Sequence, residues 1–152
     1  SRVKEELGSN VASSPFARVL ASCACRRVVM MSPFRALERK WCNFEFCLAD
    51  SHQKKVLMLT EEGIVQEGHV APKTLFDLAH KLKHFNCKMA TCKDERDEKL
   101  IDQAVETMGG YDKINLDLRR VFHDAIKDAN KHVANALELA TDMPDRRFKQ
   151  RL

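Results

Sequence analysis

The alternation of apolar and polar positions divides the chain into helices near both ends and short strands between them. Apolar spacing over 15–23 predicts an amphipathic helix. Ser32 followed by Pro33 is a typical helix start, and the apolar positions predict that this helix reaches about residue 41. Over 42–48 the apolar positions alternate with polar ones, which predicts a half-buried strand.

Two more strands are expected directly afterwards. The apolar run 56–59 is typical of a central strand, and it lies between the predicted turns 50–53 and 61–63. A third short strand begins at Ile64 and ends at Gly68. Because the three strands follow one another through short turns, we expect an antiparallel meander.

The second half of the chain is predicted to be helical. One helix runs from Pro72 to about residue 88, and another covers 93–108 before Gly109 and Gly110 end it. The last helix covers 112–141, where apolar residues recur at steps of four and three, as in a coiled-coil seam. The members of this seam are Leu118, Phe122, Ala125, Ala129, Val133, Ala136 and Ala140.

Together these elements predict a helix-dominated α+β protein in one compact domain. The chain of 152 residues is long enough for a single core. N-terminal helices are followed by a three-stranded antiparallel meander, then by a helix and a long C-terminal αα-hairpin. The expected parts are a basic N-terminal extension (1–31), an α-β-β-β-α unit (32–92), a helical hairpin (93–142) and a basic tail (143–152).

The distribution of charge says more than the modest net charge of +4. Segments 1–40, 73–93 and 143–152 are net positive, whereas the segments between them are net negative. Such a pattern suits an acidic or phosphate-bearing partner, although an unevenly charged solvated surface is the alternative. The residues assigned to partner or phosphate contact are Arg26, Arg27, Lys81, Lys83, Arg146 and Arg147.

One cluster has residue types that bind zinc. In a continuous helix, His80, His84 and Cys87 lie at i, i+4 and i+7, and Cys92 would complete a Cys2His2 set. The positive charges of three neighbouring lysines disfavour a bound metal ion, and the sequence has no Cys-x2-Cys pair. We therefore expect two exposed histidines and incidental thiols, with no metal and no cofactor.

The segment 7–37 has no acidic residue and contains four arginines, a composition typical of a mitochondrial transit sequence. A plain amphipathic helix packed on the body is the alternative. The six cysteines occur without an apolar signal core, so reduced thiols and an intracellular location are expected, mitochondrial or otherwise cytoplasmic. The longest apolar runs, such as 56–59, have four residues, so no membrane span is expected.

Catalytic motifs are absent from the sequence. It lacks a Gly-rich phosphate loop, His-Glu-x-x-His, Gly-x-Ser-x-Gly and Cys-x-x-Cys, although a nucleophilic cysteine with a distant histidine stays open. We expect a non-catalytic structural or interaction subunit of a larger macromolecular assembly, with other protein subunits as partners and a partner helix along 112–141. The alternative is an RNA-binding or ribonucleoprotein component, because the α-β-β-β-α order occurs in small RNA-binding folds. A metal-dependent or thiol enzyme ranks third.

Overall fold

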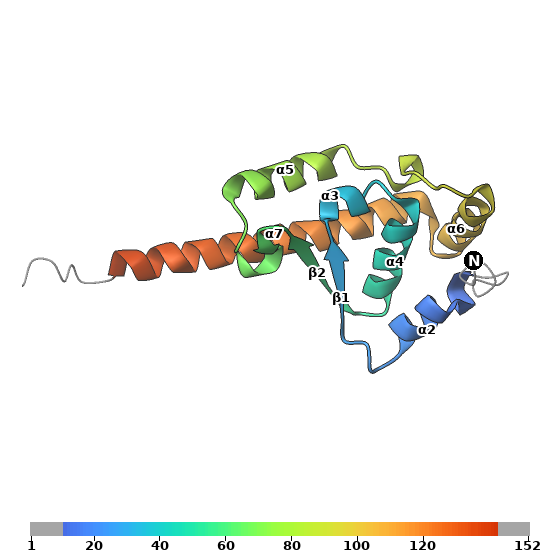
Figure 1. Ribbon diagram of the computed structural model, residues 1–152, viewed down its shortest axis with the longest axis horizontal. Coiled ribbons are helices and arrows are strands. Elements are labelled where there is room, and N and C mark those ends of the chain that lie inside the picture. The colour runs from blue at the N-terminus through green and yellow to red at the C-terminus, as the bar shows by residue number, and fades with distance from the viewer. Residues whose placement is uncertain (1–10, 143–152) are drawn as a thin grey trace, which may run out of the picture.

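A long helix, α7 (Gly110–Asp142), runs along the longest axis of the molecule, and most other elements pack against it (Figure 1). The computed structural model describes residues 11–142 of the chain. At 33 residues, α7 is about 50 Å long, which exceeds the width of the rest of a domain of this size. Its C-terminal part therefore projects beyond the body, as Figure 1 shows.

A three-stranded mixed sheet lies beside α7. Strand β1 (Arg27–Met31) pairs in parallel with β2 (Lys55–Thr60), and β2 pairs in antiparallel with the two-residue β3 (Gly63–Ile64). One face of the sheet is in the core, where Met30 and Met58 are fully buried. The side chains of β1 that point to the opposite face, such as Met31, are exposed.

Helices and 3-10 turns complete the core around α7 and the sheet. Helices α4 and α6 pack against one end of α7, and α5 lies along its other side (Figure 1). The remaining elements are η1 (Val11–Ser13), α2 (Pro15–Ala21), α3 (Pro33–Ala36), α4 (Lys40–Ser51), η2 (Val65–Glu67), α5 (Pro72–Lys83), η3 (Cys87–Met89) and α6 (Glu95–Thr107).

The predicted class, a helix-dominated α+β fold with a long C-terminal helix, is confirmed. The antiparallel meander is wrong, because β1 and β2 are parallel and helices α3 and α4 connect them. Strand β1 lies inside the segment assigned to the basic N-terminal extension. The expected tail, 143–152, lies outside the described residues.

The segment predicted as the first strand, 42–48, is part of helix α4. The alternation had placed Asn43 and Cys47 on the solvent side, but both are buried. Asn43 Nδ2 donates to the carbonyl oxygen of Leu37 at 2.9 Å, and buried Lys40 donates to Glu98 Oε1 at 2.5 Å. Because α4 is buried on most sides, its apolar residues do not form the single stripe of an amphipathic helix. The alternation of apolar and polar residues over 42–48 was therefore misleading.

Two other helix ends differ from the sequence prediction. The helix that begins at Pro33 ends at Ala36 and is followed by α4 instead of continuing to residue 41. Helix α5 ends at Lys83, so residues 84–88 do not continue it. No helix among residues 11–142 is both long enough and apolar enough to cross a membrane.

Candidate interaction site

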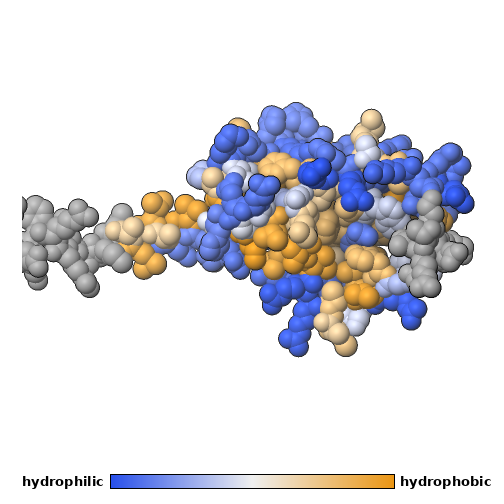
Figure 2. Space-filling model, viewed as in Figure 1, coloured by the Kyte–Doolittle hydropathy of each residue, from blue (hydrophilic) through white to orange (hydrophobic). Residues whose placement is uncertain are grey.

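The projecting part of α7 is exposed, although His132 at its start lies against Gly68 of the body. Residues 130–140, here called the α7 extension, are all exposed, whereas Ala129 just before them is fully buried. Three large apolar side chains of the extension face solvent: Val133 is 37 % exposed, Leu137 62 % and Leu139 69 %. Figure 2 shows apolar and polar residues side by side along this part of the helix.

The α7 extension continues the apolar face that the body covers. At 100° per residue, Val133, Ala136 and Ala140 fall on the face of the buried seam that ends at Ala129. Leu137 and Leu139 lie on either side of this face. Polar side chains, including Lys131 and Glu138, lie opposite. The extension is therefore amphipathic, and no described element covers its apolar face.

The extension stays helical without a covering element for two reasons. Its alanines and leucines have high helix propensity. The packed part of α7, anchored by buried Leu118 and Phe122, provides the nucleus that an isolated helix of this length would lack. The body thus holds an apolar helical face in solvent.

A cleft of about 440 Å³ lies where the extension leaves the body. The parallel register of β1 and β2 sets Arg27 directly beside Lys55, and Lys131 and His132 of α7 line the same cleft. Glu67 and Asp128 also line it. Like charges on adjacent strands repel, so we expect this basic cleft to favour a negatively charged group.

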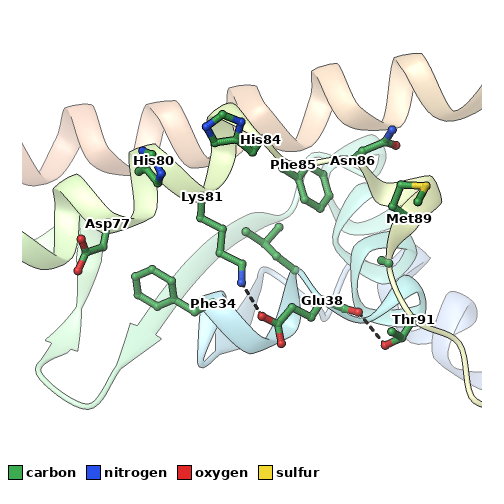
Figure 3. A pocket seen from close by; sticks show the side chains of 12 residues that line it. Phe34, Glu38, Asp77, His80, Lys81, His84, Phe85, Asn86, Met89 and Thr91 are labelled. Atoms are coloured by element: carbon green, nitrogen blue, oxygen red, sulfur yellow. Dashed lines mark hydrogen bonds and ion pairs between the residues drawn. The ribbon is translucent and has the colours of Figure 1, made fainter.

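A second hollow, the α5 groove, has a volume of about 680 Å³ and an apolar lining that includes Phe34 and Met89 (Figure 3). Lys81 Nζ lies 2.7 Å from Glu38 Oε1, and this ion pair crosses the groove. The hydrogen bond and the charge of Lys81 lower the pKa of Glu38. The predicted contact residue Lys81 is therefore already paired, whereas Lys83 is exposed at the end of α5.

The zinc candidates do not form a ligand set. The ring centroids of His80 and His84 are 5.1 Å apart, and both exposed side chains line the α5 groove. Because α5 ends at Lys83, Cys87 belongs to η3 and points into the core, where burial raises its pKa to about 11. Cys92 Sγ instead contacts the carbonyl oxygen of Asp94 at 3.5 Å. Among residues 11–142, no group of three or more His, Cys, Asp or Glu side chains is placed to hold a metal.

The predicted contact residues do not converge on one site. Arg27 lies in the basic cleft and Arg26 directly precedes β1, whereas Lys81 lines the α5 groove. Arg146 and Arg147 lie outside the described residues.

Sequence reasoning missed the rest of the basic cleft. Lys55 meets Arg27 because β1 pairs with β2, and His132 reaches the same cleft because α7 packs against η2 and β2. The β-branched pair Val28-Val29 was the signal for a strand at this position.

Comparison of the chain with protein-family models, with curated proteins and with solved structures found no match. Its function is therefore inferred from the surfaces described above.

Proposed function

We propose that the protein is a non-catalytic interaction subunit of a larger macromolecular assembly, and that the α7 extension is where another subunit binds. One observation carries the proposal. The apolar face that is buried up to Ala129 continues in the same register as the exposed residues Val133, Ala136 and Ala140. A second helix laid on this face would extend the packing of the body along the whole of α7.

The energetics of burial support this proposal. Burying apolar surface stabilises by about 25 cal/mol per Å², so covering Val133, Leu137 and Leu139 would contribute several kcal/mol to association. The fold itself has no use for these side chains, since no described element covers them. An exposed apolar face of this kind is typical of protein interaction sites.

The thiols support the non-catalytic part of the proposal. Burial raises the pKa of Cys47, and it raises that of Cys87 to about 11, so both stay protonated at neutral pH. Since the thiolate is the nucleophile, these two buried cysteines are inert.

The test is the size of the native complex in cells that produce the protein. Tagged wild-type chain and the Val133→Glu/Leu137→Glu variant are compared by size-exclusion chromatography with light scattering. We expect the wild type in a complex larger than the monomer, and the variant shifted to the monomer. Ala134→Glu places the same charge on the opposite side of the extension and should behave as the wild type. If wild type and variant elute at the same size, the proposal is wrong.

RNA binding is the second candidate function, and the basic cleft favours it. Arg27, Lys55 and Lys131 line the same cleft, and positive side chains grouped in this way bind phosphates. The probe is single-stranded oligouridine, whose affinity is measured by fluorescence anisotropy across a salt series. Loss of two phosphate contacts in Arg27→Glu/Lys55→Glu should reduce the salt slope by about 1.4. An unchanged slope excludes phosphate binding in the cleft.

A further inference from the structure

Strand β1 is at one side of the sheet and, within residues 11–142, pairs only with β2. We infer that the free edge of β1 binds an extended acidic segment of another protein, which joins the sheet as a further strand antiparallel to β1. This mode of recognition uses backbone hydrogen bonds for affinity and alternate side chains for specificity. The inference does not rest on the proposed function, because it uses none of the apolar residues of the α7 extension.

The hydrogen bonds between β1 and β2 show which backbone groups are free. The amide of Lys55 donates to the carbonyl oxygen of Arg26 at 3.3 Å, and the amide of Ser32 donates to that of Leu59 at 2.9 Å. In a strand, the N–H and C=O groups of successive residues point to opposite edges. Every second residue from 26 to 32 therefore faces β2. The residues between them, whose backbone groups point to the free edge, are Arg27, Val29 and Met31.

These outward groups have almost no partners in the described part of the chain. Within residues 11–142, no backbone group bonds to them, and the only side chain that donates to them is Cys25, with Sγ 3.8 Å from the carbonyl oxygen of Arg27. A thiol is a weak donor, so an amide can replace it. An antiparallel strand exchanges two hydrogen bonds with each residue that points toward it, so it would make about six here.

Strand β1 lacks the features that usually protect a free edge. Natural edge strands commonly carry a central lysine, a proline or a bulge. Residues 28–31 contain no charge and no proline, and the pairing with β2 has no bulge. Val29 is 46 % exposed and Met31 70 %, and both point to the same face of the sheet. Figure 2 shows apolar residues at the surface over the sheet. The edge therefore suits a strand with apolar side chains at alternate positions.

The charges at the start of β1 indicate that this strand is acidic. Arg26 and Arg27 lie beside Lys54 and Lys55, because the two strands pair in register. None of these four cations forms an ion pair within residues 11–142. An acidic side chain directly opposite Arg27 would form a favourable cross-strand pair and reduce the repulsion among the cations.

A second copy of β1 does not supply such a group. The segment 7–37 contains no acidic residue, so two paired copies of β1 would leave their basic ends uncompensated. A partner segment of the form apolar-x-apolar-x-acidic does supply it. Antiparallel pairing is the more stable direction per residue, and it places the acidic residue opposite Arg27. The two apolar residues then lie opposite Val29 and Met31.

The probe is a labelled peptide with both ends capped, Ser-Val-Thr-Val-Thr-Glu-Thr, and its binding to the purified full chain is measured by fluorescence anisotropy. We expect saturable binding with a Kd below about 1 mM. N-methylation of the second valine removes a donor that points to β1, so it should raise the Kd at least about tenfold. N-methylation of the threonine before it alters an amide that points away. This matched control should bind as the parent peptide does.

An exchange of charge tests whether the acidic residue lies opposite Arg27. A second peptide has lysine in place of glutamate. The wild type should prefer the glutamate peptide by about threefold or more, and Arg27→Glu should reverse this preference. Arg35→Glu makes the same change of net charge on α3, beyond the other end of β1, and should leave the preference unchanged. Both arginines are exposed, so the variants keep their fold.

Three results overturn the inference: no binding at about 1 mM, equal losses from the two N-methylations, or a preference that Arg27→Glu leaves unchanged. Sedimentation velocity of the full chain tests the other occupant of the edge. A dimer that dissociates when the glutamate peptide is added would show that a second copy occupies the edge, and the inference would then be wrong.

Discussion

At the scale of single residues, the side chain of Gln66 takes the place of a strand residue next to β2. It is only 8 % exposed, and Nε2 donates to the carbonyl oxygen of Val56 at 2.8 Å. Its Oε1 accepts from the amide of Met58 at 3.0 Å. Because β3 has only two residues, this amide satisfies backbone groups of β2 that no third strand reaches.

Replacement of this amide tests its role. Gln66→Leu leaves a buried N–H and a buried C=O without partners, and each costs about 1–3 kcal/mol. We therefore expect the free energy of unfolding, measured with urea, to fall by about 2–4 kcal/mol. Gln103→Leu makes the same change on the exposed side of α6. It should change the free energy of unfolding by less than about 0.5 kcal/mol. An equal loss in both variants would rule out the hydrogen bonds as the cause.

Glu45 on α4 gives a pH-dependent prediction. Burial raises the pKa of Glu45 to about 6, and the charge of Arg39 opposes this only in part. The folded state therefore holds the proton more tightly than the unfolded state, and this contribution to stability is lost as pH rises from about 4.5 through 6. We expect Glu45→Gln to raise the free energy of unfolding by about 1–2 kcal/mol at pH 7.5 and by little at pH 4. An equal gain at both pH values would contradict this.

At the scale of elements, η2 approaches α7 more closely than any side chain would allow. Gly68 ends η2 with φ of 73°, and a Cβ there would lie 2.8 Å from Cβ of His132. This close contact positions the sheet against α7, and His132 is also part of the basic cleft.

A matched pair of glycine variants isolates the effect of this contact. Gly68→Ala adds both backbone strain and a clash, so we expect the free energy of unfolding to fall by about 2–4 kcal/mol. Gly110→Ala has similar strain, with φ of 88°, but no atom lies within 4 Å of the added Cβ. Gly110→Ala should therefore lower the free energy of unfolding by only about 1–2 kcal/mol. The free energies are measured by thermal or urea unfolding. If both variants lose the same stability, η2 shifts enough to accommodate the added methyl group.

The seam of α7 makes a second prediction at this scale. Ala129 is fully buried, so Ala129→Leu should overpack the contact with the body and lower the free energy of unfolding by about 1–3 kcal/mol. Ala136→Leu, two turns later on the same face, is exposed and should change the stability of the monomer by less than about 0.5 kcal/mol. If Ala129→Leu is as stable as the parent, the seam faces water at that position.

Some elements were readable from sequence because one periodicity dominates them. Helix α5 begins at Pro72 as predicted, and β2 includes the apolar run 56–59. Helix α4 was not readable, because it is buried on most sides and its polar residues Lys40 and Asn43 find partners in the core. The pair Val28-Val29 favours a strand at β1, but the local pattern does not show its pairing with β2, which the chain reaches only after helix α4.

At the scale of the whole molecule, the α7 seam and a partner helix along it were predicted, but the residue at which the body stops covering the seam was not. The steps of four and three run without a break from Leu118 to Ala140, so the sequence does not show where the body ends. That point depends on how far the rest of the chain reaches along α7, and burial stops after Ala129. Likewise, the basic cleft is formed by three segments that are distant in the sequence, so no local motif predicts it.

The molecule thus combines a packed body with one uncovered apolar helix. The body supplies the stability that holds the extension helical, and the extension contributes nothing to the core. A helix of this kind opens readily when it is free, because its backbone hydrogen bonds are exposed to water. Covering its apolar face slows that opening.

Hydrogen exchange of the amides in 130–140 tests the central claim most directly. Exchange is followed by mass spectrometry in the native complex and in the purified chain diluted to the monomer. We predict fast exchange in the monomer and at least about tenfold slower exchange in the complex, with unchanged rates in the packed part of α7. Equally fast exchange of 130–140 in both samples would show that no subunit covers the α7 extension, and the account would be wrong.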